Sequence, residues 1–162
     1  MKYIAAAVFA LASGPVFAEL TGSTTTWELE SVVDEFTDER KVFAIIAAED
    51  GLDKGFIHVG CFPAGLEVKV GAGEYIGDKN VHNNVRYRVD HGEPVTTTMK
   101  PTSKRYVYFN DKNSPFLQQL LAGKEKVVVQ LTSYDYDTSR ATYSLNGAAA
   151  AIGAVLEACK NK

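Results

Sequence analysis

The stretch Gly55-Phe-Ile-His-Val-Gly-Cys61-Phe62 decides the fold of this chain. Successive side chains of a strand point to opposite sides, so Ile57, Val59 and Cys61 share one face. The chain has one other cysteine, Cys159, at the end of a helical pattern near the C-terminus. We therefore predict a Cys61–Cys159 disulfide that fastens the last helix to a central strand. On the chain-entropy model, a loop of about a hundred residues stabilises the fold by roughly 4–5 kcal/mol.

Residues 1–18 have the features of a secretory signal peptide. A basic start at Lys2 precedes an apolar run over residues 4–12, and Val16-Phe-Ala18 supplies small residues at the two positions that a signal peptidase reads. The run is much shorter than the roughly 20 apolar residues that cross a bilayer. We expect cleavage after Ala18, export to the periplasm or secretion, and a mature chain that does not span the membrane. Export to an oxidising compartment favours paired cysteines.

The mature chain is expected to hold one domain. Residues 19–26 form a polar, Thr-rich leader that we expect to be flexible, and residues 27–162 are long enough for a single β-rich globular domain with its own core. The whole chain has 17 Lys and Arg against 20 Asp and Glu, a formal net charge of −3. This mildly acidic balance lacks the basic footprint of nucleic-acid binding, so we expect no nucleic acid among the partners.

Short alternating or apolar runs between turn residues predict about nine strands. They lie at residues 27–33, 41–48, 55–62, 66–70, 85–89, 95–99, 105–109, 126–131 and 140–145. Helices are predicted near residues 114–122, with Ser114 as N-cap, and near residues 147–159, with Asn146 as N-cap. The fold class is therefore mainly β, an antiparallel β-sandwich or open barrel with two helices packed on the sheet.

Turns and loops are predicted between these elements. Residues 49–54 form an acidic turn, residues 100–104 a loop, and Tyr134-Asp-Tyr-Asp137 is typical of a hairpin turn. Residues 71–84 form the longest irregular stretch, rich in Gly, Asn and Asp. Such a stretch is either a binding loop or a long connection.

The sequence offers no catalytic constellation. The three histidines, His58, His82 and His91, are scattered and lack zinc-ligand spacing, so we expect no metal and no cofactor. A Gly-x-Ser-x-Gly nucleophile motif is missing, and the paired carboxylates sit in charged turns that are typical of solvated surface. We therefore expect no enzymatic activity and no catalytic residues.

Basic and aromatic residues alternate on two predicted strands. Arg86 and Arg88 share one strand face while Tyr87 takes the other. Such a stripe suits an acidic protein, a glycan or a phosphate-bearing cell-wall polymer; the solvated face of edge strands is the interpretation that the pattern favours. The candidate partner-binding residues are Tyr75, Arg86, Arg88, Arg105, Tyr106 and Tyr108.

Several motifs occur in a recognisable order. They are the Trp27-led strand, the Cys61 strand, Gly73-Glu-Tyr75-Ile-Gly77, Val85-Arg-Tyr-Arg-Val-Asp90, Pro115-Phe-Leu-Gln-Gln-Leu-Leu-Ala-Gly123, and Leu145-Asn-Gly147 through Leu156-Glu-Ala-Cys159. Together they resemble the VasI/TagO-type family of periplasmic proteins associated with bacterial type VI secretion. The resemblance spans Trp27 to Cys159 and carries over no catalytic residues.

The resemblance implies an exported, non-enzymatic accessory or binding protein of the cell envelope with a protein or envelope-polymer partner. Two alternatives stay open from the residues. One is a secreted inhibitor of a cell-wall enzyme such as lysozyme, in which a disulfide-tied β domain presents a loop. The other is a cell-wall hydrolase, which requires a cleft with converging carboxylates.

Overall fold

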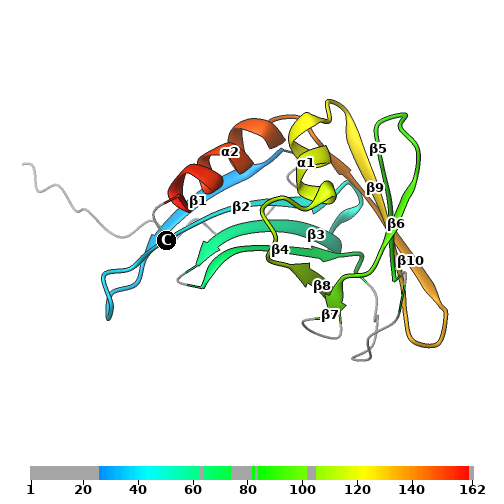
Figure 1. Cartoon of the computed structure of the whole chain (residues 1–162), viewed down its shortest axis with the longest axis horizontal. Coiled ribbons are helices and arrows are strands. Elements are labelled where there is room, and N and C mark those ends of the chain that lie inside the picture. The colour runs from blue at the N-terminus through cyan, green and yellow to red at the C-terminus, as the bar shows by residue number, and fades with distance from the viewer. Residues whose placement is uncertain (1–25, 63, 74–81, 83, 102–104, 161–162) are drawn as a thin grey trace, which may run out of the picture.

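The computed structural model describes residues 26–62, 64–73, 82, 84–101 and 105–160, and within them it has ten β-strands and two α-helices (Figure 1). The predicted fold class, mainly β with antiparallel sheets and two helices, is confirmed. The signal peptide and all but the last residue of the predicted leader lie outside the described residues and stay predictions. Among the described helices, none is both long and apolar enough to cross a bilayer.

Two antiparallel sheets build the molecule. The larger has the order β1 (Glu28–Val33), β2 (Arg40–Ala48), β3 (Gly51–Phe62), β4 (Gly65–Gly71), β8 (Tyr106–Phe109) and β7 (Lys100–Pro101). The smaller has the order β10 (Thr138–Ser144), β9 (Lys126–Thr132), β5 (Val85–Val89) and β6 (Val95–Thr97). Figure 1 shows the four-stranded sheet steeply inclined to the six-stranded one at one end of the molecule.

The two helices cover the inner side of this arrangement. Helix α2 (Ala148–Ala158) packs on β2 and β3 and against helix α1 (Pro115–Ala122). Phe116 of α1 contacts one ring from each sheet, Tyr87 of β5 at 4.7 Å and Phe109 of β8 at 5.9 Å between centroids. The helices therefore close the space between the sheets, and one continuous core joins all three layers.

The quoted strand and the last helix meet as the sequence predicted. Ile57, Val59 and Cys61 are buried on the inner face of β3, and Ile152 and Val155 of α2 are fully buried in the same core. Cys61 and Cys159 form the disulfide, with 5.5 Å between their Cα atoms. This bond joins the end of α2 to β3 beside the β3–β4 hairpin bend, where Cys61 pairs with Leu66. The predicted disulfide is confirmed.

Hydrogen bonds tie the two sheets together at β10. The Tyr143 hydroxyl donates to the carbonyl of Gly71, Trp27 Nε1 donates to the carbonyl of Ser144 at 2.9 Å, and the Glu49 N–H donates to Thr142 at 2.9 Å. Gly55 makes the first contact possible. Its φ is +136°, and a Cβ there would overlap the Gly71 carbonyl and lie 2.7 Å from the Tyr143 hydroxyl. Only glycine fits this position, because a side chain would clash with these atoms and would be strained at this positive φ.

The buried side-chain amide of Asn84 holds the segment that connects β6 of the smaller sheet to β7 of the larger one. The side chain of Asn84 is 4% exposed, and its amide donates to the Met99 carbonyl at 2.8 Å while its oxygen accepts from the Met99 N–H at 2.9 Å. Met99 therefore pairs with a side chain instead of a neighbouring strand. This pairing explains why β6 ends at Thr97, whereas the sequence predicted a strand that continues to Met99.

Two connections differ from the sequence prediction. The predicted turn at residues 49–54 is shorter, because β3 already begins at Gly51 and pairs with Ala48 across a register shift. The predicted loop at residues 100–104 begins with a short strand, β7, whose Lys100 and Pro101 pair with β8. Such a short edge strand carries no alternation of its own, so its pairing depends on the neighbouring β8.

The helix caps also differ. Helix α2 begins after Gly147, which is the N-cap in the left-handed conformation at φ +84°, and not after Asn146. The Asn146 side chain is exposed, and its backbone N–H bonds to Ser144 Oγ at 3.2 Å. Ser114 does occupy the N-cap position of α1, with Pro115 following, but its side chain makes no capping hydrogen bond.

Candidate partner-binding groove

The outer face of the four-stranded sheet carries the two arginines that the sequence singled out. Tyr87 points into the core and is 2% exposed, so its neighbours Arg86 and Arg88 point to the outer face, where both are exposed. The register then places Gln130 of β9 beside Arg86, and Arg140 of β10 beside Gln130. Three adjacent strands thus form one transverse row, Arg86–Gln130–Arg140.

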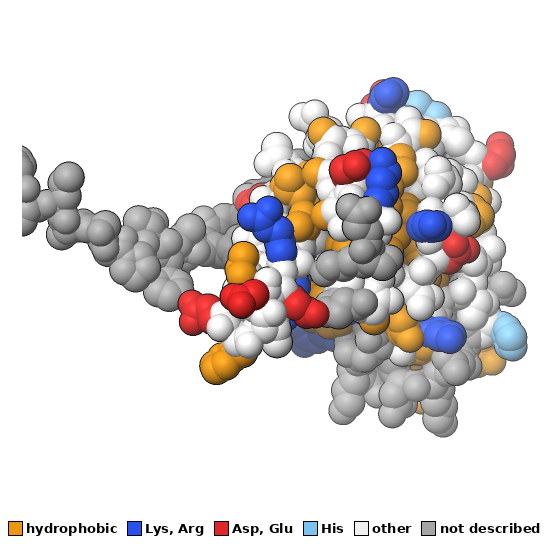
Figure 2. Space-filling model, turned by 60° about the vertical axis from the view of Figure 1, so that its left-hand side comes forward, with side chains coloured by type: hydrophobic (Ala, Val, Ile, Leu, Met, Phe, Trp, Pro, Cys, Tyr) orange, Lys and Arg blue, Asp and Glu red, His pale blue; other side chains and the backbone are white. Residues whose placement is uncertain are grey.

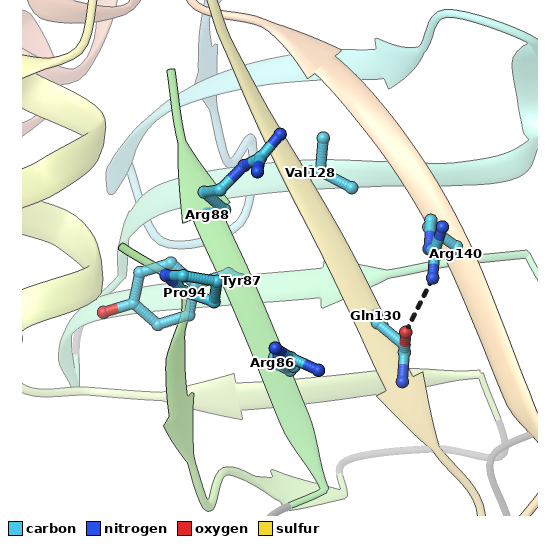
Figure 3. A pocket seen from close by; sticks show the side chains of 7 residues that line it. All are labelled: Arg86, Tyr87, Arg88, Pro94, Val128, Gln130 and Arg140. Atoms are coloured by element: carbon cyan, nitrogen blue, oxygen red, sulfur yellow. Dashed lines mark hydrogen bonds between the residues drawn. The ribbon is translucent and has the colours of Figure 1, made fainter. Parts of the chain in front are cut away.

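We call the hollow on this face the arginine groove. It has a volume of about 280 Å³ and is lined by Arg86, Tyr87, Arg88, Pro94, Val128, Gln130 and Arg140. Figure 3 shows the arginine side chains rising from β5 and β10, with Val128 and Gln130 of β9 between them. One guanidinium is held in place, because Arg140 donates to Gln130 Oε1 at 3.1 Å.

The charge of the arginine groove is not neutralised within the described part of the chain. There, none of the five ion pairs within 4.0 Å involves Arg86, Arg88 or Arg140. A guanidinium is a planar donor that matches carboxylate and phosphate groups with paired hydrogen bonds. The groove can therefore bind an anionic group through up to three cations, with Val128 and Pro94 as apolar walls.

The groove side chains are suited to binding and not to proton transfer. Arginine does not release its proton in proteins, and glutamine does not titrate. Tyr87 belongs to the lining by its strand position, but its phenol points into the core, where burial raises its pKa. Among the described residues, no group of three or more His, Cys, Asp or Glu side chains is placed to hold a metal ion.

The other predicted partner-binding residues lie elsewhere. Tyr106 and Tyr108 belong to β8 of the six-stranded sheet, Arg105 is exposed just before β8, and Tyr75 lies outside the described residues. The sequence-based interpretation had placed Arg105, Tyr106 and Tyr108 in one basic and aromatic stripe with Arg86 and Arg88. That grouping is wrong, because β5 pairs with β9 and β6 while β8 pairs with β4 and β7.

Tyr106 and Tyr108 instead join an aromatic face on the outer side of the six-stranded sheet. Tyr106 lies 4.8 Å from Phe56, and His58 lies 5.1 Å from Phe43 and 5.9 Å from Phe62, between ring centroids. Burial lowers the pKa of His58, and the neighbouring Lys69 lowers it further against the opposing effect of Glu67. The aromatic face comprises Phe43, Phe56, His58, Phe62, Tyr106 and Tyr108, all half-buried.

Sequence reasoning missed Arg140 and Gln130 of the groove. Both lie on strands that the sequence did predict, and both alternate with buried residues there. What places them beside Arg86 is the register of β5, β9 and β10. Strand pairing is a tertiary property that the alternation within one strand does not encode.

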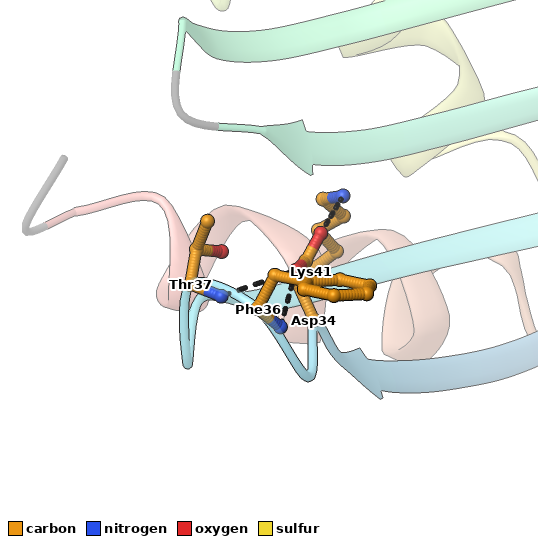
Figure 4. Close-up of polar contacts among 4 residues, drawn as sticks. All are labelled: Asp34, Phe36, Thr37 and Lys41. Atoms are coloured by element: carbon orange, nitrogen blue, oxygen red, sulfur yellow. Dashed lines mark hydrogen bonds and ion pairs between the residues drawn. The ribbon is translucent and has the colours of Figure 1, made fainter.

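A second surface is the acidic turn, residues 34–39, between β1 and β2. Asp34 Oδ1 accepts from the N–H groups of Phe36 at 3.0 Å and Thr37 at 3.2 Å, and its Oδ2 lies 3.2 Å from Lys41 Nζ (Figure 4). The Phe36 N–H, followed by the Lys41 hydrogen bond, lowers the pKa of Asp34. The turn presents a 99% exposed Phe36. Figure 2 shows acidic side chains gathered at the end of the molecule where this turn comes forward.

Comparison with known proteins identifies a fold but not a family. No protein-family model matches the chain, and no curated protein does. The fold is similar to the crystal structure of invasion associated protein B from Bartonella henselae, with a TM-score of 0.54, 17% sequence identity, and coverage of 82% of this chain and 92% of that chain. At this identity the similarity shows a shared architecture alone. The resemblance to the type VI secretion-associated family gains no support from these comparisons.

Proposed function

We propose that this chain is an exported, non-enzymatic binding protein of the bacterial cell envelope, and that its arginine groove holds an acidic segment of a protein partner. One observation carries the proposal: Arg86, Arg88 and Arg140 converge from two strands on one groove, and no described carboxylate pairs with them. Exposed cations of this kind steer and orient an anionic partner more than they stabilise the fold.

The disulfide supports the compartment. The Cys61–Cys159 bond persists in oxidising surroundings such as the periplasm and not in a reducing cytosol. It is consistent with the signal peptide predicted from residues 1–18. A role in type VI secretion is a finer proposal that rests on the sequence resemblance alone. Loss of secretion activity on deletion of the gene, restored by the wild-type chain, is the result that supports this finer role.

Binding of a defined acidic probe tests the groove. The mature chain is titrated with poly-L-glutamate, and the affinity is compared with that of Arg86→Gln/Arg88→Gln/Arg140→Gln. We expect the variant to bind at least about tenfold more weakly, equivalent to about 1.4 kcal/mol. We also expect the wild-type affinity to fall as salt is added, because exposed charges are screened.

A matched control removes the same charge elsewhere. Lys54→Gln/Lys112→Gln/Lys160→Gln loses three exposed lysines that lie outside the groove and is expected to bind poly-L-glutamate almost like the wild type. Equal weakening in both triple variants overturns the groove, because binding then follows net charge alone. Polyphosphate in place of poly-L-glutamate shows whether the groove prefers phosphate. Such a preference contradicts the acidic protein segment.

The acidic turn favours a second candidate, an inhibitor of a cationic cell-wall enzyme such as lysozyme. A hairpin tip with four carboxylates and an exposed ring, held by Asp34, suits insertion into a basic cleft. Addition of the mature chain to a lysozyme assay separates the candidates. Inhibition that Phe36→Ser abolishes and the triple arginine variant retains supports the inhibitor. Unchanged lysozyme activity removes it.

A further inference from the structure

The arginine groove and the acidic turn are complementary surfaces of the same chain. The groove offers three guanidinium groups with Val128 and Pro94 between and beside them. The acidic turn carries the carboxylates of Asp34, Glu35, Asp38 and Glu39 within six residues around Phe36. A phenyl ring also binds favourably beneath a guanidinium group, so Phe36 and the carboxylates can engage the same groove together.

The acidic turn is shaped in advance for such a contact. Asp34 accepts hydrogen bonds from two backbone N–H groups of the turn and pairs with the Lys41 ammonium, which fixes the loop without using the Phe36 side chain. The Phe36 side chain is 99% exposed and is accompanied by half-exposed Val32 and Val33 on the adjoining β1. A loop whose backbone is already held by hydrogen bonds loses little conformational freedom on binding.

The two surfaces cannot meet within one molecule. In Figure 1 the β1–β2 turn lies at the left end, and β5, β9 and β10, which form the groove, lie at the right end. The six-stranded sheet and the helices separate them. A turn that fills the groove must therefore come from another copy.

We propose that the arginine groove takes the acidic turn of a second copy of this chain, in a head-to-tail contact. The inference rests on the proposed function, because it names an occupant of the same groove. Each bound copy still has one free turn or one free groove. A contact of this heterologous kind therefore adds further copies and builds open chains, unless its rotation closes a ring.

Sedimentation velocity of the mature chain tests the contact. At low salt the weight-average sedimentation coefficient is expected to rise with protein concentration, and added salt is expected to return it to the monomer value. A wild-type chain that stays monomeric at every concentration at low salt overturns the proposal. If that chain still binds poly-L-glutamate through its groove, the proposed function stands and only this inference falls.

Two blocked variants sharpen the test. The turn-blocked variant Glu35→Gln/Phe36→Ser/Glu39→Gln keeps its groove, and the groove-blocked variant Arg86→Gln/Arg140→Gln keeps its turn. Each alone is expected to be monomeric. Their mixture is expected to form a one-to-one dimer and nothing larger, because only one native turn and one native groove can meet.

The controls exclude trivial outcomes. Thermal melts and thiol counts establish that both variants are folded with the disulfide formed, and Lys54→Gln/Lys112→Gln is expected to assemble like the wild type. Assembly that survives in both blocked variants overturns the proposal, because the contact then uses another surface. A mixture that stays monomeric overturns it as well.

Discussion

The outer faces of the two sheets are built from the same alternating pattern, but their side chains differ in the partners that they contact. On the six-stranded sheet, the aromatic rings contact one another, and Lys69 lies 2.5 Å from Glu67 and 5.6 Å from the Phe62 ring. On the four-stranded sheet, the arginines of the groove have no described carboxylate partner. The two faces therefore differ in unpaired charge, and this difference is the reason why we propose the arginine groove, and not the aromatic face, as the binding surface.

The largest expected effect on stability comes from Cys61 on the inner side of β3. Cys61 lies in the core that underlies the outer faces of both sheets. Cys61→Ser is expected to lower the free energy of unfolding by about 4 kcal/mol, because the unfolded chain without the disulfide regains the entropy of a loop whose ends are 98 positions apart in the sequence. Urea unfolding followed by circular dichroism measures the loss. The double variant Cys61→Ser/Cys159→Ser serves as the control without a stray thiol. Unchanged stability in both contradicts a structural role of the disulfide.

A smaller effect is expected on the aromatic face itself. A Cβ at Gly60 would lie 2.5 Å from the Phe62 ring and 2.9 Å from the His58 ring, so Gly60→Ala forces both rings to move. We expect a loss of about 1–3 kcal/mol, the range for an overpacked site. Chemical denaturation measures it, while poly-L-glutamate affinity is expected to stay unchanged. A loss of affinity without a loss of stability contradicts the separation of the two faces.

His58 gives the aromatic face a pH dependence that the groove lacks. Its pKa in the folded chain lies below the ordinary 6.5, so the unfolded chain binds more protons below that pH. The contribution of His58 to stability is therefore complete above pH 6.5 and is lost as the pH falls toward its folded pKa. Unfolding free energies between pH 7 and pH 5 measure this slope, and His58→Gln is expected to flatten it. An equal slope in the variant assigns the dependence to other groups.

The smallest effect on stability is expected in the groove. Arg86→Gln/Arg88→Gln/Arg140→Gln is expected to change the unfolding free energy by less than about 0.5 kcal/mol, because exposed side chains without pairing contribute little. Thermal and urea unfolding measure it. A large loss would show that the arginines serve the fold, and the contrast between the two faces would then disappear.

The fold was easier to predict from the sequence than the groove. Alternation around Ile57, the stripe around Ile152 and the cysteine count were sufficient to predict the join between β3 and α2. These signals are local to one element or fixed by pairing two unique residues. The start of α2 was harder to predict. Asn146 is the better N-cap by residue type, but the structure places Gly147 at the N-cap in a left-handed conformation.

The groove needed information that no single strand contains. Arg86 and Arg88 were predicted to share a face, and they do. Their separation from Tyr106 and their proximity to Arg140 depend on which strands pair. Strand order is decided by long-range packing and not by residue spacing.

The Asn84 amide also affects how readily the smaller sheet can pair with a strand of another molecule. By pairing with both backbone groups of Met99, it ends β6 after three residues and turns the chain toward β7 in the other sheet. One of the two edges of the smaller sheet, the β6 edge, is thereby kept too short to recruit a foreign strand. A single buried side chain thus limits the growth of the smaller sheet at its β6 edge.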